Sequence, residues 1–438
     1  MRQLVILAGG RGARLKERLG DLPKPMIPIG GIPLLEHQIA LARDHGFSEV
    51  IIFAGYRAEA ITAHLGDGGR WGVKIIALIE NEPLGTAGAV LAGFDVLADR
   101  FVVMYGDTMV NVDLARFWQT HQERGADASL FLHPNDHPLD SDLVEVNAEG
   151  WITAFHNRPH PPDRFFPNLV NAALYVVNKH ALDPWRGERG PLDFGKDLFP
   201  RMLKRGAKLF GYRSPEYIKD IGTPERYDRV CAEYAAGVVL NSSFHRPQPA
   251  VFLDRDGTLN TEVDGVTSLE KLELIAGVAE AVRELNHRGA RVVVVTNQPI
   301  VAKGWCTEAD LQQIHNKLET LLGREGAFVD RIYYCPHHPE AGFPGERVEL
   351  KIACSCRKPG IGLIQRAAQD LAIDLKSSWL IGDSTRDIQT AKNAGIRSIL
   401  VRTGYAGQDG KYNVQPDFEA DCLSQAVELI VRKSGFKP

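Results

Sequence analysis

Two aspartates lie one residue apart directly after a short apolar segment in the second half of the chain. The segment covers residues 251–253, and Asp254 and Asp256 follow it, with Gly257 and Thr258 behind them. Carboxylates at a spacing of two point to the same side where a strand continues, so they can share one metal ion and one substrate. One can then attack a phosphorus atom while the other moves protons. Asp-x-Asp also occurs in surface turns, so other motifs have to support this interpretation.

A glycine-rich turn and a lysine between two prolines suggest phosphate binding in the first half. Apolar residues 4–8 lead into a turn that carries Gly9, Gly10, Arg11, Gly12 and Arg14. Its glycines let backbone N–H groups approach phosphate oxygens, and its arginines add positive charge. Lys24 lies between Pro23 and Pro25, which presents a stiffly held cation. Each pattern alone also occurs in tight turns and surface loops.

Three of the six cysteines are grouped with a histidine. Cys335 and His337 are followed by Cys354 and Cys356. Together they offer four soft or borderline ligands, the number that a closed tetrahedral Zn²⁺ site needs. We therefore predict a structural zinc site rather than a disulfide framework, and we expect the chain in the reducing cytoplasm.

Both halves alternate short apolar segments with longer amphipathic ones. Residues 50–54, 101–105 and 292–295 are typical of buried strands, whereas 34–45 and 278–287 are typical of helices. This alternation favours parallel sheets covered on both faces, which bind ligands at the carboxyl ends of their strands. The predicted fold class is α/β, with two Rossmann-like three-layer αβα domains in tandem.

A chain of 438 residues is too long to fold around a single hydrophobic core of ordinary size, so we expect more than one domain. Residues 239–249 are polar and contain two prolines, so we predict a linker between domains 1–238 and 250–438. The formal net charge of −4 argues against a nucleic-acid binder that relies on overall positive charge. No apolar run approaches the length of a membrane span. We expect small-molecule partners, no nucleic acid and no membrane, and the sequence leaves a homo-oligomer open.

The motifs of the first half resemble the signature of the nucleotide-diphospho-sugar pyrophosphorylases. The glycine-rich turn and the Pro-Lys-Pro motif are followed, in that family's order, by a base-reading loop from Glu82 and by two aspartates at strand ends. The resemblance covers roughly residues 1–236 and is highly specific in combination. It implies the nucleotide-diphospho-sugar transferase fold and attack of a sugar 1-phosphate on the α-phosphorus of a nucleoside triphosphate, with release of pyrophosphate.

The resemblance also implies roles for individual residues. Asp107 and Asp220 are expected to hold Mg²⁺, and Arg14 and Lys24 to neutralise phosphate charge. The expected nucleotide- and substrate-binding residues are Gly9, Gly10, Gly12, Gly85, Thr86, Gly88, Arg158 and Asn171. Arg158 stands where relatives carry Lys, and Ala173 stands where they carry Gly, which crowds a close approach of the backbone.

The motifs of the second half resemble the haloacid-dehalogenase phosphatases. The zinc pattern resembles the heptose bisphosphate phosphatases in particular, over roughly residues 250–434, and the histidinol-phosphate phosphatases are the close alternative. The resemblance implies that Asp254 is a nucleophile that forms an aspartyl-phosphate and that Asp256 is the general acid and base. Mg²⁺ is expected on Asp254, the Asp256 carbonyl and Asp383. The expected substrate-binding residues are Thr296, Asn297, Gln298, Arg357 and Lys358.

Taken together, the resemblances imply consecutive steps on one sugar. A D-glycero-D-manno-heptose 1,7-bisphosphate loses its 7-phosphate, and the remaining 1-phosphate receives GMP from GTP. One alternative is a mannose 1-phosphate or other hexose 1-phosphate transferase fused to a phosphatase of different specificity, such as the histidinol-phosphate type. Another is a regulatory protein that only binds nucleotide sugars, against which the presence of Asp107, Asp220 and Lys24 argues.

Overall fold

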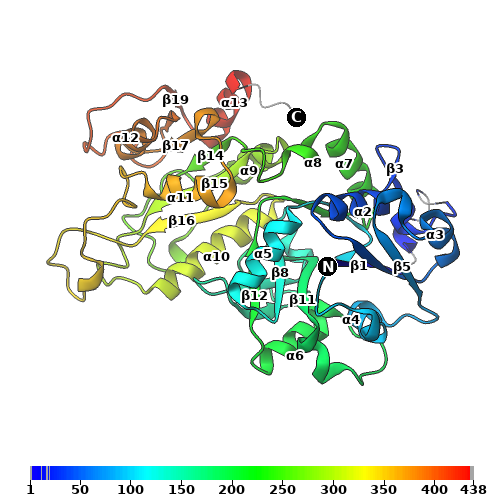
Figure 1. The fold of residues 1–438 in the computed structure, drawn as a ribbon. Coiled ribbons are helices and arrows are strands. Elements are labelled where there is room, and N and C mark those ends of the chain that lie inside the picture. The colour runs from blue at the N-terminus through cyan, green and yellow to red at the C-terminus, as the bar shows by residue number, and fades with distance from the viewer. Residues whose placement is uncertain (1, 11, 16–17, 19, 435–438) are drawn as a thin grey trace. The chain divides into compact units, whose positions relative to one another are not determined.

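The computed structural model describes residues 2–10, 12–15, 18 and 20–434, and it divides into two compact units (Figure 1). The first unit consists of Met1–His133, Val144–Asn157 and Val170–Ser243. The second consists of Pro134–Leu143, Arg158–Leu169 and Phe244–Pro438. Two short segments from the first half of the sequence therefore belong to the second unit.

A mixed sheet forms the centre of the first unit. Its strand order is β10-β9-β11-β6-β1-β4-β5, with β8 paired to β11 and β12 paired to β8. β1 is parallel to β4 and β6, whereas β11 is antiparallel to β6 and β8. The strands are β1 (Gln3–Ala8), β4 (Glu49–Ala54), β5 (Lys74–Ile79), β6 (Arg100–Tyr105), β8 (Ala128–His133), β9 (Leu143–Val146), β10 (Ile152–His156), β11 (Val170–Asn178) and β12 (Leu209–Arg213).

Helices of the first unit pack their apolar faces on this sheet. Leu4 and Ile6 of β1 share a core cluster with Leu35, Ile61 and Phe117, which come from three different helices. Consecutive apolar residues make β1 buried on both faces, as in sheets that are covered on both sides. The helices are α2 (Leu34–Asp44), α3 (Ala58–Leu65), α4 (Gly85–Ala92), α5 (Leu114–Arg124), α6 (Phe199–Lys204), α7 (Pro224–Ala235) and α8 (Val238–Asn241).

A parallel sheet with the strand order β16-β15-β14-β17-β18-β19 forms the centre of the second unit. Its strands are β14 (Ala250–Leu253), β15 (Arg291–Asn297), β16 (Arg331–Cys335), β17 (Trp379–Gly382), β18 (Arg397–Val401) and β19 (Phe418–Ala420). The helices are α9 (Val278–His287), α10 (Glu308–Arg324), α11 (Gly362–Leu371), α12 (Thr385–Ala394) and α13 (Leu423–Ser434).

Alternate residues of β14 enter two different core clusters, because successive side chains point to opposite faces of a strand. Val251 and Leu253 pack with apolar residues of α9, α10 and α13. Ala250 and Phe252 pack with residues of α11 and α12. Helices therefore cover both faces, and the second unit has three layers.

The predicted α/β class with two such domains in tandem is confirmed, with one difference in the first sheet. We expected parallel strands throughout, but β11 returns antiparallel between β6 and β8. The apolar pattern of β11 shows that the strand is buried, and it carries no information about direction.

The chain passes from the first unit to the second between Ser243 and Phe244, inside the predicted linker 239–249. The start of that stretch is helical, because α8 covers Val238–Asn241. Val239 is buried in an apolar cluster with Ile29 and Leu34. Only the later part of the stretch therefore lies outside the first unit.

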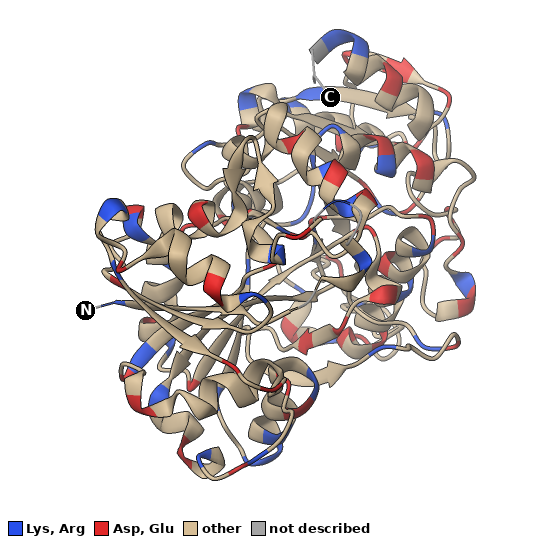
Figure 2. Cartoon of the chain, turned by 90° about the vertical axis from the view of Figure 1, so that its right-hand side faces the viewer, with Lys and Arg blue, Asp and Glu red and all other residues tan. Residues whose placement is uncertain are grey.

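Charged residues of both signs are interspersed along the chain (Figure 2), which agrees with the small formal net charge of −4. None of the helices in the described part of the chain combines the length and the apolar character needed to cross a membrane.

Candidate active sites

A cavity of about 420 Å³ lies at the carboxyl ends of β1 and β6 in the first unit. The strands end there at the glycine-rich turn and at Asp107, as ligand sites of α/β sheets do. The predicted residues that line the cavity are Gly9, Gly10, Gly12, Arg14, Lys24, Gly85, Thr86 and Asp107. Arg11 lies outside the described residues.

Lys24 and Asp107 form an ion pair in this cavity. Lys24 begins a short 3-10 turn after Pro23 and is 8% exposed. Its Nζ donates to Asp107 Oδ2 at 2.5 Å. Burial of the lysine is tolerated because the carboxylate compensates its charge. The pair places a cation and an anion side by side in the lining of the cavity.

Asp220 comes next to Asp107 through a two-stranded ribbon. β7 (Thr108–Asn111) and β13 (Tyr217–Asp220) pair antiparallel, with Asp220 opposite Thr108. The Ile221 N–H then donates to the Asp107 carbonyl oxygen at 2.9 Å. The ribbon thus brings together the backbones of two aspartates that are 113 positions apart in the sequence, and of the two only Asp107 lines the cavity. Carboxylates are the ligands that Mg²⁺ prefers.

Arg226 is a partner of Asp220 that the sequence analysis did not assign. Its Nη1 donates to both carboxylate oxygens at 3.0 and 2.9 Å. Arg14 lies near the same carboxylate, since a Cβ added at Gly222 would lie 2.6 Å from Asp220 Oδ2 and 3.4 Å from Arg14 Nη2. Arg226 lies only six residues after Asp220, so the sequence contained this signal.

The base-reading loop is held by a neighbouring segment of the same unit. The N–H groups of Ala87 and Gly88 both donate to the Leu192 carbonyl oxygen, at 2.8 and 3.1 Å. Gly85 has φ +71°, and a Cβ there would lie 2.6 Å from that same oxygen. Gly88 does not line the cavity, and a Cβ added at Gly88 would point towards Gly190. These glycines therefore serve packing of the loop, and Gly85 also borders the cavity.

Arg158 and Asn171 do not line the cavity either. Arg158 belongs to the second unit, and its Nη1 donates to the Asp140 carbonyl oxygen at 2.8 Å and to Asp140 Oδ1 at 2.6 Å. Asn171 lies in β11, where the register with β8 shifts between Asn171 and Tyr175. Ala173, within this shift, adopts φ +58°, a conformation that favours glycine.

Glu80 is a cavity residue that the sequence analysis missed. It directly follows β5 and packs closely against Gly9, since a Cβ added at Gly9 would collide with its carboxylate. Burial raises the pKa of this carboxyl group above its ordinary value. Its place at the carboxyl end of a parallel strand is the signal that could have found it.

A cluster of carboxylates around a buried lysine forms the site of the second unit. Asp254 follows β14 and Asp383 follows β17, while Asp387 lies in the first turn of α12. Lys358 Nζ lies 2.9 Å from Asp254 Oδ2 and 2.5 Å from Asp387 Oδ1. One carboxylate oxygen from each aspartate lies within 4.8 Å of the others, an arrangement that could hold a metal ion. The sequence analysis did not assign Asp387.

The pKa values of Asp254 and Asp383 are raised, which indicates that the charge of Lys358 alone does not compensate the carboxylates of this cluster. Burial, followed by the charge of Asp387, raises the pKa of Asp254 to about 6. Burial, followed by the charge of Asp254, raises the pKa of Asp383 to about 8. Crowded carboxylates resist ionisation unless a cation joins them. The donor set therefore fits a hard divalent ion such as Mg²⁺.

Asp256 lies beside this cluster and is held in place by three side chains. Arg255 Nη2 donates to both of its oxygens at 2.9 Å, Gln298 Nε2 to Oδ2 at 2.8 Å and Asn260 Nδ2 to Oδ1 at 3.0 Å. The carboxylate of Asp256 is not among the grouped metal ligands, which leaves its carbonyl for that role. The arrangement suits a group that exchanges protons in a fixed orientation.

The predicted phosphate-binding residues also support one another. Asn297 Oδ1 accepts from the Lys358 N–H at 2.9 Å, and Asn297 Nδ2 donates to the Lys358 carbonyl oxygen at 3.1 Å. Gln298 Nε2 donates to Thr296 Oγ1 at 2.9 Å. Asn297 thus fixes the loop that carries the lysine, and Gln298 connects Thr296 to Asp256.

Cys335, His337, Cys354 and Cys356 lie together, with one ligand atom from each within 4.8 Å of the others. The Sγ atoms of Cys335 and Cys356 are 3.3 Å apart, and His337 Nδ1 lies 3.3 Å from Cys356 Sγ. All six cysteines are free of disulfides. Three sulfurs and one nitrogen at these separations fit the edges of a tetrahedral zinc site. Arg357 Nη1 donates to the His337 carbonyl oxygen at 3.1 Å, so the same loop supports Arg357.

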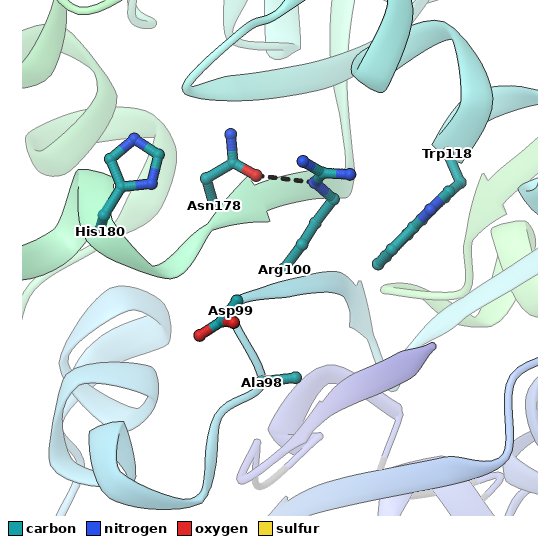
Figure 3. A pocket seen from close by; sticks show the side chains of 6 residues that line it. All are labelled: Ala98, Asp99, Arg100, Trp118, Asn178 and His180. Atoms are coloured by element: carbon teal, nitrogen blue, oxygen red, sulfur yellow. Dashed lines mark hydrogen bonds between the residues drawn. The ribbon is translucent and has the colours of Figure 1, made fainter. Parts of the chain in front are cut away.

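A second cavity of the first unit contains none of the predicted residues (Figure 3). It has about the same volume, near 420 Å³, and Arg100 Nε donates to Asn178 Oδ1 at 2.7 Å within it. Arg100 begins β6 and Asp107 follows its end, so the two cavities lie at opposite ends of this strand.

Family models match one region in each half of the chain. Residues 3–237 match the nucleotidyl transferase family, and residues 355–426 match the HAD-hydrolase-like family. The D-glycero-D-manno-heptose-1,7-bisphosphate 7-phosphatase of Thermosynechococcus vestitus is 41% identical over 191 residues, which cover 42% of this chain and 96% of that relative.

Solved structures resemble one part of the chain each. HddC from Yersinia pseudotuberculosis is 28% identical and covers 53% of this chain and 100% of its own, with a TM-score of 0.46. The D,D-heptose 1.7-bisphosphate phosphatase from B. bronchiseptica, solved with magnesium and phosphate, is 31% identical and covers 42% of this chain and 99% of its own, with a TM-score of 0.37. The chain therefore belongs to the nucleotidyl transferase family through residues 3–237, and to the D-glycero-D-manno-heptose-1,7-bisphosphate 7-phosphatase family through its haloacid-dehalogenase-like part.

Proposed function

We propose that the chain carries out two consecutive steps of heptose activation in the reducing cytoplasm. Its domain 250–438 removes the 7-phosphate of D-glycero-D-manno-heptose 1,7-bisphosphate. Its domain 1–238, joined by the linker 239–249, transfers GMP from GTP to the remaining 1-phosphate and releases pyrophosphate. The observation that carries the proposal is that a buried lysine contacts an aspartate at a strand end in each unit, Lys24 with Asp107 and Lys358 with Asp254.

In the phosphatase reaction, Asp254 attacks the 7-phosphorus and forms an aspartyl-phosphate. Asp256 donates a proton to the sugar oxygen as the phosphorus–oxygen bond breaks, and it then removes a proton from the water that releases inorganic phosphate. Lys358 compensates the charge of the nucleophile. Mg²⁺ held by Asp254, Asp383, Asp387 and the Asp256 carbonyl would add positive charge for the phosphate oxygens.

In the transferase reaction, an oxygen of the sugar 1-phosphate attacks the α-phosphorus and pyrophosphate leaves. Protein groups mainly position the reactants and neutralise charge in such a transfer. Lys24 and Arg14 line the cavity where the phosphates would lie, beside the glycine-rich turn. Asp107 and Asp220 would hold Mg²⁺, which neutralises the developing charge on the phosphate oxygens.

Glu80 supports guanine as the base. The guanine edge offers donors at N1 and N2, and an ionised carboxylate can accept from both. Adenine offers an acceptor at the corresponding ring nitrogen, so it would repel the same group. Glu80 lines the cavity between Gly9 and the loop Pro83–Gly85, and no cation contributes to its pKa among the described residues. A half-buried carboxylate that has no partner cation among the described residues is a group with which this base would pair.

A panel of nucleotides and sugar phosphates with the full chain and Mg²⁺ tests the proposal. We expect pyrophosphate release with GTP and heptose 1-phosphate, and phosphate release from heptose 1,7-bisphosphate. Asp107→Asn should abolish the first activity and leave the second, and Asp254→Asn should do the reverse. Loss of both activities in both variants would contradict independent sites. Preference for mannose 1-phosphate or histidinol phosphate would instead support the alternative of different specificity.

A further inference from the structure

The segment between β18 and β19 passes beside α12 (Figure 1), and its first part is a loop, residues 403–412, that contacts the carboxylate cluster of the second unit. β18 is parallel to β17, so the loop leaves the sheet at the same edge as Asp383, which follows β17. Ligands of α/β sheets bind at this edge. The loop is therefore placed to act on the group that could hold a metal ion.

One oxygen of the Asp383 carboxylate is taken by this loop. The Tyr405 N–H donates to Asp383 Oδ2 at 2.7 Å, and the Gly407 N–H donates to the Asp383 carbonyl oxygen at 2.8 Å. Asp383 is 1% exposed, so the contact is shielded from water. Among the described residues, only Tyr405 hydrogen-bonds this carboxylate. Oδ1 is therefore the oxygen of Asp383 that remains for a metal ion.

Two glycines make room for the same carboxylate. A Cβ added at Gly404 would collide with Asp383 Oδ2, and so would a Cβ added at Gly257. The two glycines also meet each other, because the Cβ at Gly404 would lie 2.7 Å from the Gly257 Cα. Thr403 Oγ1 donates to the Gly257 carbonyl oxygen at 2.6 Å and joins the two segments. Oδ2 thus lies in a slot that a larger residue at either position would close.

The later part of the loop is attached to the start of α12. The Thr385 N–H donates to Asp409 Oδ1 at 2.8 Å, and the Tyr412 N–H donates to Thr385 Oγ1 at 3.1 Å. Asp387, another carboxylate of the cluster, lies in the same first turn of α12. The loop therefore contacts the segments that carry two of the three grouped carboxylates.

We propose that the loop 403–412 is a positioning element for the metal ion of the phosphatase site. It holds Asp383 Oδ2 through the Tyr405 N–H, and it thereby fixes the orientation of the oxygen that a metal ion would use. Partner groups that orient a metal ligand in this way commonly set the affinity of the site. The inference rests on the proposed function, because that function requires the metal ion.

The variant Gly404→Ala in the full chain tests this proposal, because the added Cβ would displace Asp383 Oδ2 from its slot. Mn²⁺ serves as the probe in place of Mg²⁺, since the electron paramagnetic resonance signal of free Mn²⁺ measures how much is unbound. We expect one Mn²⁺ site of the chain to weaken about tenfold, as metal sites do when they lose such a partner group. Excess Mg²⁺ should restore most of the phosphate release, because the ligands themselves are unchanged.

Gly410→Ala is the matched control within the same loop. Gly404 and Gly410 both have φ +60°, but a Cβ at Gly410 would meet nothing within 4 Å. The control therefore introduces the same backbone strain without touching Asp383, and it should leave Mn²⁺ affinity unchanged. Equal Mn²⁺ affinity in the two variants would overturn the proposal.

Thr403→Val is a milder variant that keeps the proposal testable if Gly404→Ala does not fold. It removes the hydrogen bond to the Gly257 carbonyl oxygen at nearly constant volume. We expect Mn²⁺ binding to weaken about threefold, and unchanged binding would count against the loop. If the unaltered chain bound Mn²⁺ but released phosphate from no substrate, the proposed function would fail by itself. The comparison of the variants would still decide whether the loop positions the metal ion.

Discussion

Arg255 donates from Nη2 to both carboxylate oxygens of Asp256 at 2.9 Å, and none of its side chain is exposed. A charge this deeply buried is tolerated only with a partner, and here the partner is the proposed acid–base group. The pair fixes Asp256 in one orientation beside the nucleophile.

We expect Arg255→Met to lower kcat of the phosphatase about 100-fold, the lower end of what a positioned acid and base contributes. The remaining contacts from Gln298 and Asn260 should keep Asp256 in the site without fixing it. Phosphate release measures the effect, and pyrophosphate release by the same sample serves as the control. An unchanged kcat in a folded variant would contradict the role of Arg255.

Mg²⁺ should stabilise the second unit more at pH 8 than at pH 5. The pKa of Asp254 is raised to about 6 and that of Asp383 to about 8, both above the ordinary 3.8. Bound protons therefore stabilise the metal-free fold, and this stabilisation is lost as the pH rises from about 4 to about 8. Mg²⁺ binds the ionised carboxylates and displaces the protons. The shift of Tm with Mg²⁺ measures the effect, and equal shifts at both pH values would argue against metal binding here.

The variant Glu80→Gln should reduce the preference for GTP over ATP. A glutamine presents one acceptor and one donor where the carboxylate presents two acceptors, so one contact with guanine becomes repulsive. We expect the ratio of kcat/KM values to fall at least tenfold. Glu59→Gln is the matched control, because Glu59 is exposed and does not line the cavity. A similar fall in both variants would remove the basis for assigning base recognition to Glu80.

Zinc should be present at one ion per chain when the protein is purified without chelator. Removal by a chelator is expected to lower Tm, because metal binding to the Cys335, His337, Cys354 and Cys356 group stabilises its loop. The loop also supports Arg357 through the His337 carbonyl oxygen, so KM of the phosphatase should rise. Elemental analysis and calorimetry measure these effects. Cys356→Ser should reproduce them, whereas Cys422→Ser, outside the group, should not.

The variant Ala173→Gly should stabilise the protein. Ala173 has φ +58°, which costs an L-residue about 1 kcal/mol relative to glycine. We expect the free energy of unfolding to rise by about that amount, and denaturant unfolding measures it. Ala172→Gly is the matched control and should lower stability, since Ala172 does not have a positive φ.

The sequence predicted those site residues that lie within two positions of the end of a buried strand in a known motif. Asp107, Asp254 and Asp383 each do so, and the ends of neighbouring parallel strands meet at one edge of a sheet. Asp387 was not predicted to be a metal ligand, because it lies one helical turn beyond Asp383. A carboxylate at that position also serves as an ordinary cap of the helix N-terminus. Glu80 follows a strand as well, but no familiar motif marked it.

The contacts of α10 could not be predicted from the sequence. Thr320 and Phe166 are 154 positions apart, and nothing local indicates that they meet. The helical pattern of α10 shows its apolar face, whereas a polar side chain in a helix is ordinarily exposed. Only the packed structure shows that Glu319 and Thr320 are covered.

Gly323 and Pro138 fit together with no room for another atom, although the expected linker lies between them in the sequence. Severing the chain near residue 245 would therefore not return two whole enzymes. The amino-terminal fragment would keep two loops whose natural cover had gone with the other piece. The carboxy-terminal fragment would expose the face of α10 that carries Glu319 and Thr320. Such fragments should be poorly soluble when made separately and should recover when produced in the same cell.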